Sequence, residues 1–158
     1  MDSPKHQLSM TVLMTPDMAN FSGNVHGGTI LKLLDQVAYA CAARYAGRYV
    51  VTLSVDQVMF REAIHVGELV TFLASVNHTG TSSMEVGIKV VAENPRDRKK
   101  HHAMTSFFTM VAMDSEGHPT AVNPLVPETE VEKRRHAAAM ERRKLRAQYE
   151  AAHRATHA

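Results

Sequence analysis

The sequence predicts an α+β domain in which one antiparallel sheet wraps around a single long helix, with a further helix at the C-terminal end. The segment 29–45 is apolar on almost every face, which is typical of a buried helix. Later segments alternate apolar and polar residues with a period of two, as half-buried strands do. Residues 127–158 are dominated by Glu, Arg, Lys and Ala, which favours a solvent-exposed helix. A lone helix stays buried only if a curved sheet surrounds it and another surface covers its remaining side.

The individual elements follow from the same periodicity and from turn residues. Residues 8–14 alternate and predict a first strand, and the Pro-, Asn- and Gly-rich residues 15–23 predict a loop. Thr29 is the expected N-cap of the long helix, and Gly47 is its expected left-handed stop. Short links between the later strands predict that consecutive strands are antiparallel neighbours. These later strands are expected at 50–60, 68–78, 82–93 and 102–113.

Length and composition restrict the class of protein. A chain of 158 residues fits one compact domain with an appendage. Its 44% hydrophobic and 22% charged residues exclude a disordered or fibrous chain. No segment approaches the ~18 uninterrupted apolar residues of a membrane-spanning helix. The single cysteine, Cys41, excludes an intrachain disulfide and is expected to be buried and inert on the apolar helix. Because the N-terminal residues are polar and show no secretory signal, a cytoplasmic location is expected.

Charge is unevenly distributed along the chain. Residues 1–126 carry 10 Lys and Arg against 11 Asp and Glu, whereas residues 127–158 carry 8 against 5. This contrast predicts a near-neutral domain at 1–126 and a basic helical extension at 127–158. The basic extension raises the hypothesis of nucleic-acid binding. Its arginines are interleaved with glutamate and alanine, however, and the chain has no tryptophan for base stacking, so no nucleic-acid partner is expected.

The segment 24–28, Asn-Val-His-Gly-Gly, is the most informative feature for chemistry. Two glycines directly before a buried helix leave backbone N–H groups unshielded by a Cβ, which is the geometry of an anion or oxyanion site. Asp35 lies about two turns along the same helix, and a carboxylate on a largely apolar helix is costly unless it is exposed, paired or used. Asn24 adds an amide that can orient water or a carbonyl. Together these groups are what the addition of water to an acyl carbonyl requires.

Each of these residues also has a plain structural interpretation. The glycine pair can be a tight turn, and Asn24 can be a left-handed turn residue. Asp35 can pair with Lys32 or Tyr39 on a solvated stripe of the helix. His26 has the chemistry of a base, but a histidine in a glycine-rich turn is more often a packing or hydrogen-bonding residue. The residues by themselves therefore predict a hydrolytic site while these alternatives stay open.

Four segments resemble the acyl-CoA thioesterases of the hotdog fold, and the resemblance covers residues 8–126. The similarity is greatest to the cytosolic long-chain acyl-CoA hydrolases and their single-domain bacterial relatives. It implies a hotdog fold, hydrolysis of fatty acyl-CoA to a free fatty acid and CoA, and no metal or cofactor besides the CoA of the substrate. The segments are PDMANFSGNVHGGTI at 16–30 followed by Leu34-Asp35, FREAIHVGE at 60–68, GTSSMEV at 80–86 and AENP at 92–95.

The resemblance also implies a site shared by two subunits. Asn24 of one chain would face Asp35 of the other, and the Gly28 N–H would polarise the thioester carbonyl. Asp35 would act as general base on water or as nucleophile, and the sequence leaves both open. The expected assembly is a homodimer, further associated into a trimer of dimers, and a single chain is expected to be inactive. Two alternatives remain: a hydratase or dehydratase with His26 and Asp35 as acid and base, and a non-catalytic acyl-CoA-binding regulator.

The residues expected to bind substrate lie in three segments. The resemblance places CoA near the 80–83 turn and the Arg61 region, and small hydroxyl residues after a glycine can donate hydrogen bonds to phosphate. An ordinary turn at the start of a strand is the alternative for Ser82 and Ser83. The C-terminal helix is expected to pack on the oligomer or to lie near the CoA site. The predicted substrate-binding residues are His26, Gly27, Arg61, Gly80, Thr81, Ser82 and Ser83.

Overall fold

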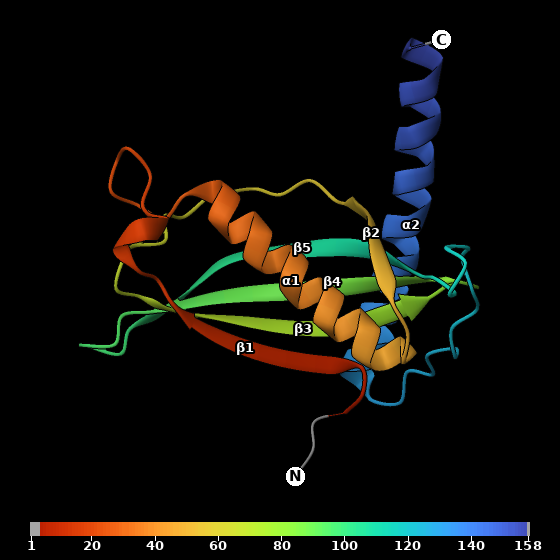
Figure 1. Cartoon of the computed structure of the whole chain (residues 1–158), viewed down its shortest axis with the longest axis horizontal. Helices are drawn as coiled ribbons and strands as arrows, with labels where there is room; N and C mark the ends of the chain where they lie inside the picture. Colours follow the sequence, from red (N-terminus) through yellow and green to blue (C-terminus); the bar gives the residue numbers. More distant parts are fainter. Residues whose placement is uncertain (1–3, 158) are drawn as a thin grey trace.

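The computed structural model describes residues 4–157 (Figure 1), so the predicted boundaries at residues 1 and 158 lie outside the described residues. Within the described range, no helix has the length and hydrophobicity needed to span a membrane. In chain order, the elements are β1 Gln7–Leu13, the 3-10 helix η1 Pro16–Met18, α1 Gly27–Ala46, β2 Val50–Val55, β3 Leu69–Thr79, β4 Ser83–Glu93, β5 Lys100–Ala112 and α2 Glu130–Thr156.

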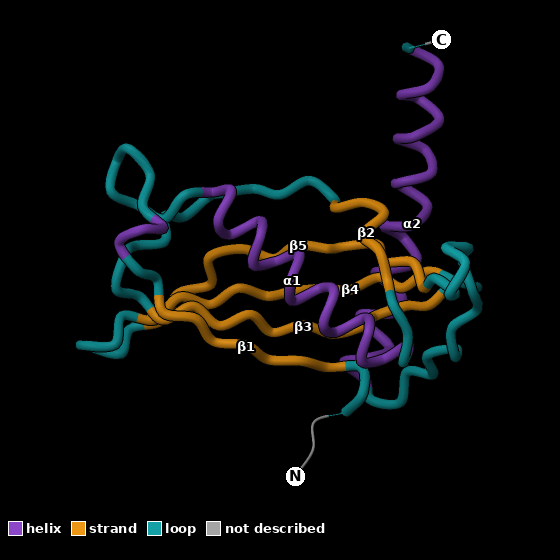
Figure 2. The backbone as a smooth tube through the Cα atoms, in the orientation of Figure 1, coloured by secondary structure: helices purple, strands orange, loops and turns teal. Residues whose placement is uncertain are grey.

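The strands form one antiparallel sheet in the order β1-β3-β4-β5-β2. The sheet curves around α1, which lies diagonally across its concave face (Figures 1 and 2). α2 packs on the opposite face against β3, and its last turns extend beyond the sheet. A sheet wrapped around one long helix is the hotdog arrangement, so the expected fold class and the expected C-terminal helix are confirmed.

One strand pairing differs from the prediction. The expected pairing of the 50–60 strand with the next strand is wrong, because β2 pairs with β5, with Val50 opposite Ala112. The segment 56–68 is too long for a hairpin turn, and it carries the chain past the N-terminal end of α1 before β3 begins (Figure 1). A register shift near Thr52 also interrupts β2, which ends sooner than expected. β2 is consequently an edge strand of the described sheet.

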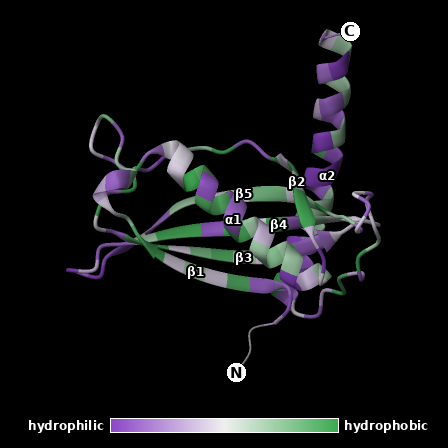
Figure 3. Cartoon of the chain, viewed as in Figure 1, coloured by the Kyte–Doolittle hydropathy of each residue, from purple (hydrophilic) through white to green (hydrophobic). Residues whose placement is uncertain are grey.

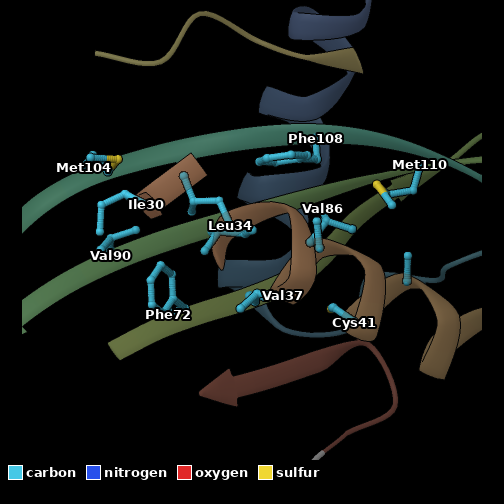
Figure 4. Packing of buried hydrophobic residues seen from close by; sticks show 14 of the residues in the cluster. Ile30, Leu34, Val37, Cys41, Phe72, Val86, Val90, Met104, Phe108 and Met110 are labelled. Atoms are coloured by element: carbon cyan, nitrogen blue, oxygen red, sulfur yellow. The ribbon is translucent and has the colours of Figure 1, made fainter. Parts of the chain in front are cut away.

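The core lies between α1 and the concave face of the sheet. Leu34 and Ala38 of α1 are 0% exposed, and burying a side chain of the size of Leu34 contributes about 1.5–3 kcal/mol. Figure 3 shows hydrophobic colouring along β3 and β4 and hydrophilic bands along α2. Figure 4 shows the apolar side chains of α1 packed against those of the strands, namely Ile30, Leu34, Val37 and Cys41 with Phe72, Val86, Val90, Met104, Phe108 and Met110.

Cys41 is buried in this core, as expected. It is 1% exposed, and burial raises the pKa of its thiol to about 12. The side chain therefore stays protonated at neutral pH, and since the thiolate is the reactive form, Cys41 is a structural residue.

The N-terminal end of α1 also differs from the prediction. The N-cap is His26 and not Thr29. The His26 Nδ1 accepts a hydrogen bond from the Gly28 N–H at 2.9 Å, and the Thr29 N–H already bonds to the His26 carbonyl oxygen at 3.0 Å. The imidazole nitrogen satisfies one of the unpaired N–H groups of the first turn, so both glycines belong to the helix. Gly47 ends the helix with a left-handed φ of 65°, as predicted.

α2 begins with a capping box made by Thr129 and Glu132. The Glu132 carboxylate accepts hydrogen bonds from the N–H groups of Glu128 at 2.8 Å and Thr129 at 3.2 Å. It also lies 3.1 Å from the His6 Nε2. These contacts lower the pKa of Glu132, and the backbone hydrogen bonds are the largest cause. The start of α2 is thereby attached both to its own backbone and to the residue preceding β1.

We expect the stability difference between the wild type and Glu132→Gln to be larger near pH 6 than near pH 3. A lowered pKa means that ionised Glu132 stabilises the folded chain above the ordinary value of 4.5. That contribution is lost as the pH falls through the lower folded-state pKa. Urea unfolding followed by circular dichroism, at one protein concentration, measures both free energies of unfolding. An equal difference at both pH values would contradict this role of Glu132.

Candidate active site

The predicted site residues occupy separate places in the fold. Asn24, His26 and the glycine pair lie at the N-terminal end of α1, whereas Asp35 lies farther along α1 beside β2. The 80–83 turn joins β3 to β4 at the opposite end of the sheet (Figure 1). Arg61 is exposed in the segment between β2 and β3. A single chain therefore separates the groups that one reaction needs.

The loop before α1 is held by the side chain of Asn20. The Asn20 Oδ1 accepts three hydrogen bonds, from the Ser22 N–H at 2.9 Å, the Ser22 hydroxyl at 2.7 Å and the Asn24 N–H at 3.2 Å. Because the oxygen is occupied by these donors, the Nδ2 is the group of this amide that remains to donate a hydrogen bond outward. The loop thus holds the Asn20 amide by its oxygen and leaves the Nδ2 as a donor.

Asn24 is held by His65 from the segment between β2 and β3. The Asn24 Oδ1 lies 3.0 Å from the His65 Nδ1, and the two residues form an isolated antiparallel bridge. The backbone N–H of His65 donates a hydrogen bond to the carboxylate of buried Glu68 at 2.7 Å. Asn24 is therefore a fixed residue whose amide oxygen is already engaged.

The glycine pair forms the first turn of α1. The Gly28 N–H is occupied by the His26 Nδ1, whereas the Gly27 N–H makes no hydrogen bond within residues 4–157. A Cβ on residue 28 would approach the His26 ring to 3.1 Å, and one on residue 27 would meet the Phe60 ring at 3.5 Å. His26 is the cap of this turn, so another acceptor can reach the Gly28 N–H only by taking the place of the His26 ring.

Asp35 lies on the exposed side of α1 and is bound to β2. The Thr52 hydroxyl donates a hydrogen bond to the Asp35 Oδ1 at 2.6 Å. The carboxylate is thus oriented by the neighbouring strand, whereas the sequence suggested Lys32 or Tyr39 as its partner. An open groove of about 370 Å³ surrounds it, lined by Asp35, Gln36, Tyr39, Tyr49, Val50, Val51 and Thr52.

Asp35 and the glycine pair lie too far apart in one chain to act on the same carbonyl. The step from Gly28 to Asp35 along α1 corresponds to about 10 Å of helix rise. A general base and an oxyanion donor must each approach the reacting group to about 3 Å. One chain therefore provides two incomplete half-sites, one with N–H and amide donors and one with a carboxylate.

The β2 edge has the properties of a contact surface for a second chain. β2 pairs with β5 on one side only in the described sheet. Tyr49, Leu53 and Val55 at this edge are 61%, 68% and 43% exposed. Unpaired strand edges with exposed apolar side chains are sites where another chain pairs. The same edge borders the Asp35 groove.

Sequence reasoning did not single out Asn20, Thr52 or His65. Asn20 and His65 belong to segments quoted for their family resemblance, but neither has a periodic signal that marks a function. Thr52 reads as an ordinary strand residue, and its role depends on β2 lying beside α1. No sequence signal pairs Thr52 with Asp35, because their contact depends on how β2 packs against α1.

The described residues contain no group of three His, Cys, Asp or Glu side chains that could hold a metal ion. The chemistry available at the half-sites is that of one carboxylate, two side-chain amides, a hydroxyl and backbone N–H groups. This set can orient and deprotonate water and can stabilise a developing oxyanion.

Comparison with known proteins assigns the chain to a family. The model of the thioesterase superfamily matches residues 22–99. Protein VdlD of Helicobacter pylori is 48% identical over 140 residues, covering 89% of this chain and 80% of that protein. YkhA of Bacillus subtilis, named as an uncharacterized acyl-CoA thioester hydrolase, is 40% identical, covering 78% and 72%. The human cytosolic acyl coenzyme A thioester hydrolase is 39% identical, but this chain spans only 34% of its length.

Solved structures give the same result. An acyl-CoA hydrolase of Staphylococcus aureus, in complex with butyryl coenzyme A, coenzyme A and coenzyme A disulfide, superposes with a TM-score of 0.87 at 32% identity, covering 95% of this chain and 92% of that one. A hexameric acyl-CoA thioesterase superposes with a TM-score of 0.88 at 35% identity, covering 92% and 93%.

Variants of the S. aureus hydrolase share this structure. One asparagine, one aspartate or one threonine is changed to alanine, and these variants superpose on the chain with TM-scores of 0.89, 0.87 and 0.86. In that protein the asparagine precedes the aspartate by fifteen residues, and the threonine follows it by seventeen. From the relatives and the fold, this chain belongs to the thioesterase superfamily, among relatives named acyl-CoA thioester hydrolases.

Proposed function

We propose that this protein hydrolyses fatty acyl-CoA to a free fatty acid and CoA, with Asp35 activating the attacking water. The observation that carries the proposal is the Asp35–Thr52 pair at the open groove beside β2. Asn20, Asp35 and Thr52 have the same spacing as the three residues altered in the S. aureus hydrolase. Residues of the same types at the same spacing in similar folds support a common site.

Asp35 is the base in this mechanism. The Thr52 hydroxyl occupies its Oδ1, which leaves Oδ2 to accept a proton from water. The departing group is the thiolate of CoA, which is stable enough to leave without a strong general acid. Attack of Asp35 itself on the thioester is the second form of this mechanism, with an acyl-enzyme intermediate that water then hydrolyses.

The amide that orients the substrate is Asn20, and Asn24 supports it. Asn20 presents its Nδ2 outward because three donors hold its oxygen. Asn24 supplies one of those donors through its N–H, and its own amide oxygen is engaged by His65. The sequence-based prediction gave the orienting role to Asn24, whereas spacing and hydrogen bonding favour Asn20.

The thioester oxygen binds at the glycine pair. In the chain the Gly28 N–H donates to the His26 Nδ1, and the exposed His26 ring can rotate to another rotamer so that the thioester oxygen replaces it. The Gly27 N–H lies one residue away as a second donor. His26 and Gly27 border this position, and their part in substrate binding stays a prediction.

Two chains share each site. If a second α1 packs antiparallel across the β2 edge, its Asp35 lies near the glycine pair of the first chain, and the twofold axis creates two such sites. Exposed apolar residues at that edge support the homodimer. The hexameric form of a related acyl-CoA thioesterase supports further association into a trimer of dimers. The cytosolic relative supports a cytoplasmic location.

The other two functions have less support. A hydratase with His26 and Asp35 as acid and base is not the activity in the names of the relatives, and it gives Thr52 no part. A non-catalytic acyl-CoA regulator leaves the oriented carboxylate at the groove unexplained. Hydration of crotonyl-CoA, followed by ultraviolet absorbance, separates the hydratase from the hydrolase.

The Asp35→Asn variant is expected to lower kcat for acyl-CoA hydrolysis by about 10²–10⁴, because an amide cannot take a proton from water. Thiol release from acyl-CoAs of increasing chain length measures the loss. Lys32→Ala, on an exposed position of the same helix, is the control and keeps wild-type turnover. If Asp35→Asn turns over at the wild-type rate, the mechanism is wrong.

The Asn20→Ala variant is expected to lower kcat by about 10²–10³, the cost of one donor to the oxyanion. Asn24→Ala keeps the backbone N–H that binds Asn20 and removes only the side-chain contact with His65, so it has a smaller effect on the same assay. Circular dichroism spectra of both variants establish that each is folded. If Asn24→Ala lowers kcat more than Asn20→Ala does, the residue that orients the substrate is Asn24.

Mixing two inactive variants tests whether the site is shared. When Asp35→Asn and Asn20→Ala chains are unfolded together and refolded, half of the random dimers contain one intact site, so about a quarter of wild-type activity returns. A site built within one chain predicts no recovery, because every chain in the mixture carries a defect. Refolding each variant alone provides the baseline.

A further inference from the structure

Neighbouring arginines of α2 differ in their partners. Arg142 binds both oxygens of Glu85, through Nε at 3.0 Å and Nη2 at 2.7 Å. Arg146 Nη1 binds Asp56 at 2.9 Å and Glu85 at 3.3 Å. Arg143, between them, makes no hydrogen bond or ion pair with any of residues 4–157. A guanidinium with no internal partner, on a helix held firmly by its neighbours, is available for an external anion.

Arg143 lies over the turn that joins β3 to β4. A Cβ on residue 80 would meet the Arg143 Nη1 at 3.1 Å and the Ser83 Oγ at 2.6 Å. The guanidinium of Arg143 and the hydroxyl of Ser83 both lie close to Gly80, and a side chain at this position would displace them. The Gly80 N–H donates a hydrogen bond to the Ser83 carbonyl oxygen at 2.9 Å, which closes the turn.

The turn offers further donors but has no cation of its own. Residues 79–83 are Thr-Gly-Thr-Ser-Ser. The carbonyl oxygens of Thr81 and Ser82 accept hydrogen bonds from Val122 and Ala112, which attach the turn to the sheet and to the segment after β5. The N–H groups of Thr81 and Ser82 make no hydrogen bond within the described chain. Free N–H groups and adjacent hydroxyls can donate hydrogen bonds to phosphate, and Arg143 supplies the positive charge that the turn lacks.

Two histidines and a paired carboxylate lie near Arg143. The His78 and His136 rings lie 5.1 Å apart between β3 and α2. The pKa of His78 is lowered, first by burial and then by the charges of His136 and Arg143. Glu85, the nearby carboxylate, is already occupied by Arg142 and Arg146. Among the described residues, an anion at this end of the hairpin therefore meets the unpaired guanidinium of Arg143, while the nearby carboxylate of Glu85 is already paired.

We propose that Arg143 adds a phosphate-binding cation to the 80–83 turn, where the family resemblance already implies CoA, so that the C-terminal helix binds the CoA nucleotide as part of the substrate site. This inference rests on the proposed acyl-CoA substrate. A planar guanidinium fits phosphate oxygens in a bidentate manner, and the turn N–H groups and hydroxyls approach the same group from the sheet. The basic extension thereby serves a near-neutral domain that has to hold a highly anionic substrate.

The test compares Arg143→Ala with Lys144→Ala, which removes the same charge from the next, exposed position of α2. Within residues 4–157, Lys144 makes only a solvent-exposed pair with Glu141 at 3.4 Å. Calorimetric titration with CoA is expected to show about ten- to hundredfold weaker binding for Arg143→Ala, the range of a charge-assisted contact. Lys144→Ala stays within about twofold of the wild type. Because Arg143 has no internal partner, the thermal unfolding midpoint stays unchanged.

Kinetics provide a second measurement. Arg143→Ala raises KM for acyl-CoA by the same factor and leaves kcat within about twofold. Its KM for the matching acyl-pantetheine, which lacks the nucleotide, equals that of the wild type. Gly80→Ala pushes the guanidinium away from the turn and shows the same selective loss. Titration with dephospho-CoA identifies whether the diphosphate or the ribose phosphate is bound.

The outcomes separate this inference from the hydrolase proposal. Equal affinity of wild type and Arg143→Ala for CoA overturns the inference. The inference is also overturned if Arg143→Ala loses binding of ATP but binds CoA as the wild type does, because the site then binds a free nucleotide. If Arg143 is required for CoA binding but no acyl-CoA releases thiol, the phosphate site stands and the hydrolase proposal fails.

Discussion

The burial of one helix against a single curved sheet is the constraint on which the rest of the molecule depends. α1 has its apolar residues on most of its surface, and the sheet covers only part of it. The side left over carries Asp35, Gln36 and Tyr39 beside the unpaired edge of β2. A second chain can cover this side without burying new polar backbone, because strand pairing satisfies the free edge. The geometry that buries α1 therefore also leaves a carboxylate at a surface suited to association.

The polar groups of the candidate site are fixed by elements that the core holds rigid. Thr52 of β2 orients Asp35, and His65 orients Asn24. The backbone N–H of His65 is itself bound to buried Glu68. Each contact joins α1, or the loop before it, to a different segment of the chain. Asp35 and Asn24 therefore keep their positions without substrate, whereas the Gly28 N–H becomes available to an oxyanion only when the His26 ring moves.

The sequence predicted those features in which local pattern and long-range packing agree. The long helix, its end at Gly47 and the period-two strands have strong local signals, and Asp35 stood out as a charge on an apolar helix. The pairing of β2 with β5 has no local signal, since the partner lies far along the chain. His26 was missed as the N-cap because Thr29 is the commoner capping residue type. Thr52 and His65 acquire their roles only through contacts between distant segments.

The charges of α2 explain why a basic extension suits a near-neutral domain. Glu85 is only 3% exposed, and a buried carboxylate without partners is strongly destabilising, so Arg142 and Arg146 are committed to it. Their contacts determine the rotation of the helix on the sheet. Since successive residues are about 100° apart, the position of Arg143 follows from theirs. That rotation directs its guanidinium over Gly80, at a turn whose own residues carry no positive charge. The excess charge of the extension is thus divided between holding α2 on the sheet and supplying one cation to the hairpin.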